Sequence, residues 1–527
     1  MDGKQKTRVL FVRYQPGRPS SHSSNGEISQ QKHAAREYHR KAKEKRRSAR
    51  QAEDTANDEA LAQAGPLMGS THKVMLPRSK STQALVPSPA RGLGGGSVDP
   101  FNSYTVKDLS PHAHRMLDYS LTYQWPLFSF ANPGATVEDM KRHVMGRIMF
   151  SATSLYAVVF VGATHWAISQ YGREVPQENA MLRLNYKNSA LRQLAADVQN
   201  TGPNVPNETL YTMMALAAYG RSGEKLKPPP YKPNQSVLAT AHELEFYSRL
   251  PIEWAHLRAL FHIIKERGGL PAISRPGFAI ITSFYDILTS CQRLVAPTFP
   301  PLESTGSLVS TWPPVETRTP LSYSLGTGFS SLSDEATYVR LCTVIDYVVQ
   351  ITLGYDRYER RSPDAPILYH VIRARSAVIH DLLSLPDSVG DAVTPDSIIY
   401  EMSRLGSLAY MLISLYPIAP GNGPHAELAR RLQGLLGHSS RLGMWDTHLP
   451  FLLWAVVLGG IMAKEFASRA WYVQYLSSSG LKDTFSTWSA VSTIMTAFLW
   501  HKSGCESAGK ELWEQSWDIT QQRAASV

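Results

Sequence analysis

The chain has 527 residues, of which 43% are hydrophobic, and its formal net charge is +10. This length allows two to four ordinary domains, or one large domain with tails, and the apolar fraction suffices for a sizeable buried core. Three cysteines, none of them in a CxxC pair, exclude a structural zinc site built on cysteines and favour a reducing compartment.

The positive charge is concentrated at one end of the chain. Residues 1–100 hold 18 Lys and Arg against nine Asp and Glu, whereas residues 101–527 hold 36 against 35. A basic tail on a neutral body suits a tail that meets an anionic partner, either nucleic acid or a nuclear import receptor.

Residues 1–98 are expected to be a disordered N-terminal region that contains one basic helix. Residues 29–53 have strong helix formers and neither Pro nor Gly, with Ser29 as a candidate N-cap. The chain then turns to Ala, Gly, Ser and Pro and ends this region in "RGLGGGS", which is typical of a linker.

From Asp99 onward, apolar residues recur at helical spacing and alternating β-branched runs are scarce. The predicted helices span 138–160, 188–198, 208–219, 251–269, 277–292, 336–352, 366–385, 395–415, 424–435, 449–476, 482–500 and 508–520. Residues 297–335, rich in Pro, Ser, Thr and Gly, are predicted to form a long exposed loop. No repeat of fixed period is present, so residues 99–527 are predicted to be an all-α domain, a large irregular array of helices.

Two apolar stretches, 149–168 and 451–463, raise the question of a membrane span. The first contains Ser, Thr, Gly and His, and the second is short for a bilayer. We interpret both as buried helices and expect no membrane partner.

The basic segment 31–50 is the most charged part of the chain. As a helix it places six cations on one stripe, and three more widen that stripe. These nine residues are Lys32, Arg36, Arg40, Lys41, Lys43, Lys45, Arg46, Arg47 and Arg50. The cluster "RKAKEKRR" (40–47) fits a nuclear localisation signal. Nonspecific DNA affinity, sequence-specific DNA binding and a solvated or protein-binding face are the other interpretations. Ala34-Ala35 match a bZIP basic region, but no leucine zipper follows, so we reject bZIP.

No motif for catalysis is apparent. The sequence has no P-loop, GxSxG or HExxH pattern, and Glu253 and His256 form a single Glu-x-x-His where a di-iron site needs two. A catalytic triad dispersed along the chain leaves no linear pattern. We therefore predict no catalytic residue, no metal ligand and no cofactor, and we expect that the protein is not an enzyme.

Several of these pieces, taken in order, resemble the fungal-specific transcription-factor-like proteins sometimes called tachykinin-family proteins, which are related to the regulatory domain of fungal zinc-cluster activators. The resemblance lies in Phe11-Val12, the basic stretch, "DPFNSYTV" (Asp99, Pro100, Phe101, Tyr104), "NYKNSALRQL", "NETLYTMMALAAY", "WAHLRALFHIIKERGGL" (His256, Leu260, Arg267, Gly268, Gly269) and "FYDILTSCQRLVAPTFP" (Asp286, Pro297, Phe299, Pro300). It covers about residues 9–300 and continues more loosely to the end. Zinc-cluster members carry six N-terminal cysteines, whereas this chain has none before Cys291.

The resemblance implies an all-helical regulatory domain and a role in transcription in the nucleus, without a zinc cluster. The expected partners are an import receptor, other transcription regulators and nonspecific DNA. The alternatives are a protein-interaction scaffold with no DNA role and an enzyme with an unrecognised site.

Overall fold

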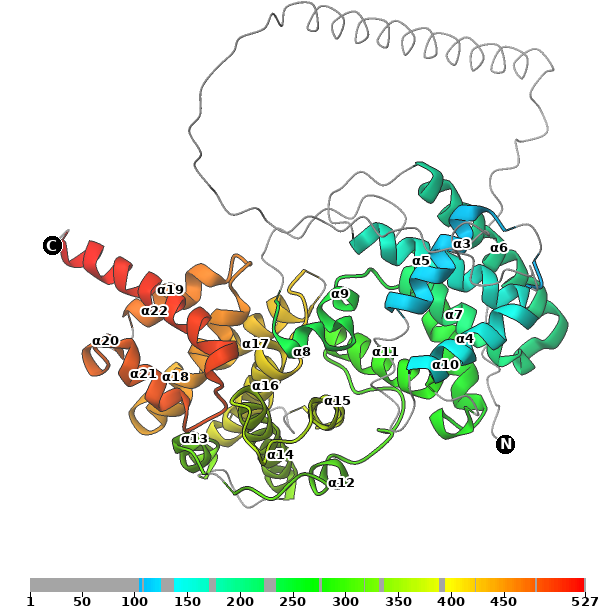
Figure 1. Ribbon diagram of the computed structural model, residues 1–527. Helices are drawn as coiled ribbons and strands as arrows, with labels where there is room; N and C mark the ends of the chain where they lie inside the picture. The colour runs from blue at the N-terminus through cyan, green and yellow to red at the C-terminus, as the bar shows by residue number, and fades with distance from the viewer. Residues whose placement is uncertain are drawn as a thin grey trace, which may run out of the picture. The chain divides into compact units, whose positions relative to one another are not determined.

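Helices alone make up the regular structure of the residues that the computed structural model describes (Figure 1). These residues are 104–106, 109–124, 137–169, 177–221, 234–273, 277–316, 318–330, 336–387, 394–421, 423–478 and 481–525. Of them, 76% are helical and none lies in a β-strand, so the predicted all-α class is confirmed. All belong to one compact unit.

The bounds of the elements are as follows in chain order. They are α3 (Pro111–Tyr119), η1 (Ser120–Gln124), α4 (Val137–Phe150), α5 (Ala152–Ser169), α6 (Gln177–Thr201), η3 (Gly202–Asn204), α7 (Asn207–Tyr219), α8 (Val237–Thr240), η4 (Ala241–Glu243), α9 (Leu244–Ser248), α10 (Trp254–Glu266), η5 (Leu270–Ala272), α11 (Phe278–Arg293), α12 (Thr305–Val309), α13 (Pro320–Ser324), η6 (Thr327–Phe329), α14 (Ala336–Glu359), α15 (Leu368–Leu383), α16 (Pro395–Tyr410), η7 (Met411–Leu415), α17 (His425–Arg441), α18 (Trp445–Met462), α19 (Arg469–Ser478), α20 (Leu481–Thr484), α21 (Trp488–Met495) and α22 (Lys502–Ala525). The elements η1 and η7 are π-helical turns, and the other η elements are 3₁₀ turns.

Two apolar helices, α5 and α18, are core helices of the array. Helix α5 packs against α3, α4, α6 and α7, and α18 packs against α16, α17, α19, α21 and α22. Both are long and apolar enough to cross a membrane by length and composition, but 72% of α5 and 67% of α18 are buried inside the structure. Burial of a continuous apolar surface explains why neither helix has a polar face.

Close packing of α5 depends on a missing side chain at Gly162. A Cβ atom there would lie 2.1 Å from the Ser120 hydroxyl oxygen and 2.7 Å from the Met116 carbonyl oxygen. Only glycine therefore allows α3 and η1 to approach α5 this closely.

Helix α7 is buried on all sides rather than along one face. Every residue from Thr209 to Tyr219 is buried, because α5, α6 and α10 pack around it. Helix α10 ends as predicted: Gly268 and Gly269 have φ of 99° and 83°, and the Gly269 N–H donates to the Ile264 carbonyl oxygen at 2.9 Å. Pro251 precedes this helix rather than lying in its first turn.

Three predicted helices are interrupted. The predicted helix 138–160 divides at Ser151 into α4 and α5. The predicted helix 449–476 is two helices, α18 and α19, separated by turns at residues 463–468. These turns contain neither Gly nor Pro, so packing of α19 against α18 and α22 overrides local propensity. The predicted helix 482–500 divides at Thr487, whose hydroxyl caps α21 by accepting from the Ala490 N–H.

The segment 297–335 was expected to be one exposed loop, and its described residues fit this expectation only in part, since many are exposed but others are helical or buried. It contains the short elements α12, α13 and η6. Its apolar side chains enter the core, since Phe299, Leu308, Trp312 and Phe329 are each less than 10% exposed. Pro, Ser, Thr and Gly break long helices, but they do not prevent burial of the aromatic residues between them.

Candidate functional site

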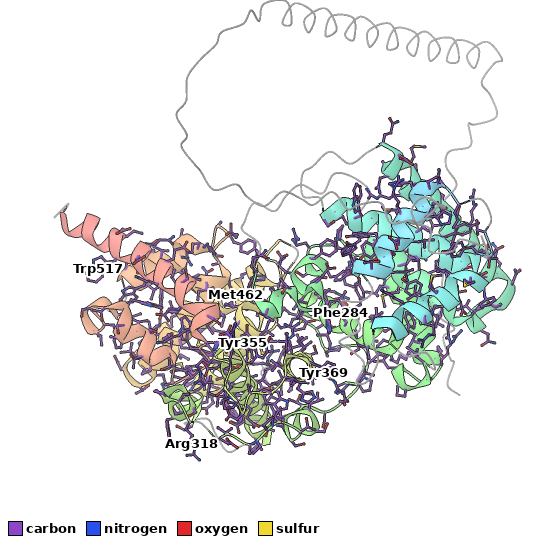
Figure 2. All side chains as sticks on the ribbon, viewed as in Figure 1. Phe284, Arg318, Tyr355, Tyr369, Met462 and Trp517 are labelled. Atoms are coloured by element: carbon purple, nitrogen blue, oxygen red, sulfur yellow. The ribbon has the colours of Figure 1, made fainter. Side chains whose placement is uncertain are left out.

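A cavity of about 310 Å³ lies between α11 and α15. Figure 2 shows Phe284 on α11 and Tyr369 on α15, the two helices that contribute most of the wall. The lining residues are Ile280, Ser283, Phe284 and Ile287 of α11, Ile372, Arg373, Ser376 and Ala377 of α15, Leu308 of α12, Pro301, Leu302 and Glu303 of the preceding loop, and His242 of η4. The α11 residues follow the i, i+3, i+4, i+7 spacing of one helix face.

The loop that closes one side of the cavity is held by Asp286. The Asp286 side chain is 2% exposed, and its two carboxylate oxygens accept hydrogen bonds from the Thr298 and Phe299 backbone N–H groups, each at 2.9 Å. Burial raises the pKa of Asp286, although these two N–H groups oppose the rise. The motif "FYDILTSCQRLVAPTFP" is thus a helix carboxylate and the loop that it binds.

Helix α15 holds the same loop at two further points. The Nε2 atom of His380 donates to the Phe299 carbonyl oxygen at 2.9 Å, and the Thr305 hydroxyl donates to the Asp381 carboxylate at 2.6 Å. Burial lowers the pKa of His380, but Asp381, the Phe299 carbonyl and Asp286 together raise it above its usual value. These hydrogen bonds fix the chain at Phe299 and at Thr305, and residues 300–304 between them make none of these bonds; they are called the suspended segment below.

An ion pair joins this suspended segment to α15 at the edge of the cavity. The Arg373 guanidinium contacts the Glu303 carboxylate and also lies 5.1 Å from the centre of the Tyr369 ring. The Arg373 side chain is 22% exposed and the Glu303 side chain 44%. Arginine is thus the more buried partner, on a rigid helix, and glutamate is the more exposed partner, on a loop.

A second arginine, Arg375, lies buried two positions further along α15. Its guanidinium donates to the carbonyl oxygens of Leu238 at 2.5 Å, Leu415 at 3.1 Å and Ala241 at 3.5 Å. Burial lowers the pKa of Arg375 to about 10. These bonds join α15 to α8 and to the π-helical turn η7, so one side chain ties together three segments behind the cavity.

His242 lines the cavity in an unusual backbone conformation. His242 and Glu243 have φ of 57° and 49°, which side-chain-bearing residues rarely adopt. The His242 ring packs edge-on against Phe284, with the ring centres 6.2 Å apart. Burial, helped by the charge of Arg375, lowers the pKa of His242 to about 3. The imidazole is therefore neutral at physiological pH.

Two other polar constellations have the residue types of proton-transfer chemistry. Tyr119 Oη lies 2.9 Å from His165 Nδ1, and His165 Nε2 lies 2.7 Å from a Glu243 carboxylate oxygen. In the second, the Ser503 hydroxyl lies 2.9 Å from His501 Nδ1 and donates to Glu359 at 3.1 Å. None of the residues of these two constellations lines the 310 Å³ cavity.

The residues predicted from sequence lie elsewhere or outside the described residues. All nine cations of the basic segment fall outside them, so their predicted role stays a prediction. Glu253 is the N-cap residue of α10, and its carboxylate lies 3.9 Å from Arg221. Burial lowers the pKa of His256. Within the described ranges, no group of three or more His, Cys, Asp or Glu residues could hold a metal ion.

Nothing in the sequence marks the cavity. Glu303, His242 and Arg373 are far apart in the sequence and belong to no motif. The resemblance motif around Asp286 pointed to the loop, but not to the side chains that face it. The cavity residues of α11 have the spacing of any buried helix face, so periodicity could not separate a cavity wall from core.

Comparisons with protein-family models, with curated proteins and with solved structures give no match for this chain.

Proposed function

We propose that this chain is a nuclear transcription-regulatory protein of fungal type that has no zinc-cluster DNA-binding domain. The basic segment 31–50 brings the protein into the nucleus and gives it weak affinity for DNA. The helical domain is a binding module that regulates through other molecules. The asymmetry of charge supports the first part, since residues 1–100 carry a net charge of +9 and residues 101–527 a net charge of +1.

The cavity is the observation that carries the second part, a binding role for the helical domain. Eight of its thirteen lining residues are apolar, and its polar groups are few. Binding sites for small molecules have this composition: an apolar wall buries the ligand, and a few polar groups orient it. A nuclear protein with such a site could respond to a small molecule, which is what a regulatory domain does.

The nuclear role is tested by imaging two variants of the full chain. Changing Lys41, Lys43, Lys45, Arg46 and Arg47 to Ala removes the proposed localisation signal and should move the protein to the cytoplasm. A matched control with Arg46→Lys and Arg47→Lys keeps the charge and should stay nuclear. The thermal unfolding of the helical domain should be the same in both variants, because these residues precede that domain. An alanine variant that stays nuclear would contradict this role.

DNA affinity is tested by a salt titration with random duplex DNA. Cations that contact phosphates position a protein without reading sequence, so affinity should be on the order of micromolar or weaker at physiological salt. If about six cations engage phosphates, the log–log slope against salt should be about −5. A preference of about a thousandfold for one short sequence would instead identify a specific DNA reader.

A further inference from the structure

The size of the cavity limits its ligand to a small molecule. A volume of about 310 Å³ is at the low end of the range for ligand sites. A ligand at this end of the range is closer in size to a short-chain molecule than to a large cofactor. The apolar residues on α11, α12 and α15 favour a hydrocarbon body for most of the ligand.

The ion pair at the edge of the cavity indicates the charge of the ligand. Arg373 is the more buried partner and is fixed on α15, whereas Glu303 is the more exposed partner on the suspended segment. Releasing Glu303 into water costs little, because its side chain is already 44% exposed. Releasing Arg373 would leave a partly buried charge without its partner. A ligand carboxylate can thus replace Glu303 at Arg373 more easily than a ligand cation can replace Arg373 at Glu303.

The buried guanidinium of Arg375 adds positive potential behind the same wall. Its hydrogen bonds within the described residues go to main-chain carbonyl oxygens, which carry partial rather than full negative charge. Its charge acts on His242, which lines the cavity. Glu303 is the sole carboxylate among the lining residues, so once it is displaced the cavity faces guanidinium charge.

We propose that this cavity binds a small amphiphile with one carboxylate and a short hydrocarbon chain, and that the ligand carboxylate replaces Glu303 at Arg373. The chain then packs against Phe284, Ile287 and Ile372. The loop keeps its place during the exchange, because its bonds to Asp286 and Asp381 do not involve Glu303. This assignment rests on the proposed binding role of the helical domain and names the class of ligand.

The test compares octanoate with 1-octanol, which has the same chain and no charge, in calorimetric titrations of the full chain. Octanoate should bind about tenfold tighter than octanol, the equivalent of one partly buried ion pair. Arg373→Gln should weaken octanoate about tenfold and leave octanol unchanged. Glu303→Gln should tighten octanoate several-fold, because the internal competitor is gone. The control Arg360→Gln removes an exposed ion pair with Asp356 and should change neither affinity.

Cavity-filling variants locate the site. Ala377→Leu should abolish binding of both probes, and Ser283→Leu does the same from the opposite wall if the first variant fails to fold. Equal affinity for the two probes would overturn the carboxylate assignment and leave the binding role standing. An unchanged octanoate affinity in Glu303→Gln would overturn the exchange at Arg373. Failure of both probes to bind at millimolar concentration would overturn the assignment and the proposed binding role together.

Discussion

Replacing Asp286 with Asn should loosen the loop that forms one side of the cavity. The carboxylate accepts two backbone N–H groups at 2.9 Å, from Thr298 and Phe299. The Asn carbonyl oxygen can accept one of them, while its NH₂ group faces the other. A buried donor left unpaired costs about 1–3 kcal/mol, and the remaining bond loses its charge assistance, which is worth about 1 kcal/mol.

A partial gain offsets this loss. Burial raises the pKa of Asp286, so the folded protein holds this charge at a cost that Asn removes. We expect a net destabilisation of about 2 kcal/mol, by urea unfolding. Hydrogen exchange should localise it: a loss of about 2 kcal/mol corresponds to about 30-fold faster exchange of the amides at 298 and 299 when the loop opens.

The control is Asp118→Asn, a change at an exposed residue of α3 that should alter the free energy of unfolding by less than about 0.5 kcal/mol. If Asp286→Asn is as stable as the control and the exchange of residues 298 and 299 is unchanged, the two hydrogen bonds do not hold the loop.

The remaining predictions concern acid, packing and a partly buried carboxylate. Burial lowers the pKa of His242 to about 3 and that of His425 to about 4, from the usual value of 6.5. Below pH 6.5 the unfolded chain takes up a proton at each imidazole and the folded protein does not. The folded state therefore loses stability as the pH falls from 6.5 toward these values. The free energy of unfolding should fall by about 2 kcal/mol for each between pH 7 and 5, and a His242→Asn variant should show a shallower decline. In thermal unfolding, Gly162→Ala should destabilise by more than about 2 kcal/mol, because the new Cβ meets a backbone oxygen. In the same assay Gly434→Ala on α17, where nothing lies within 4 Å, should stabilise by up to about 1 kcal/mol. Glu506→Gln should lower the urea midpoint by the equivalent of about 2 kcal/mol, since the carboxylate accepts from two tryptophan indoles and a serine and an amide has one acceptor oxygen; an unchanged midpoint would refute that role.

The helical character of the chain could be predicted because it depends on residues that are close together in the sequence. Gly268 and Gly269 end α10 where the sequence predicted an end, since a left-handed C-terminus needs glycine. The break between α18 and α19 could not be predicted, because it depends on where α22 packs and the intervening residues favour a helix.

The candidate site could be predicted still less. An arginine is usually solvated, so nothing in the sequence marks Arg375 as a buried residue that bonds to three carbonyl oxygens. Likewise, Glu303 and Arg373 meet only because Asp286 and Asp381 fix the loop between them. Contacts of this kind arise from the tertiary arrangement and leave no periodic pattern in the chain.

The two anchors of the loop have a consequence for how such a protein could diversify. Residues 300–304 carry Pro301, Leu302 and Glu303 into the cavity, while the bonds on either side hold the chain to α11 and α15. Residues 300–303 can therefore be replaced, or this stretch lengthened by one or two residues, while Ser304 keeps its place as the N-cap of α12, because surface connections tolerate insertion far better than packed elements. Grafting different segments in place of residues 300–303 would yield a series of proteins that share one scaffold and differ in the molecules they accept.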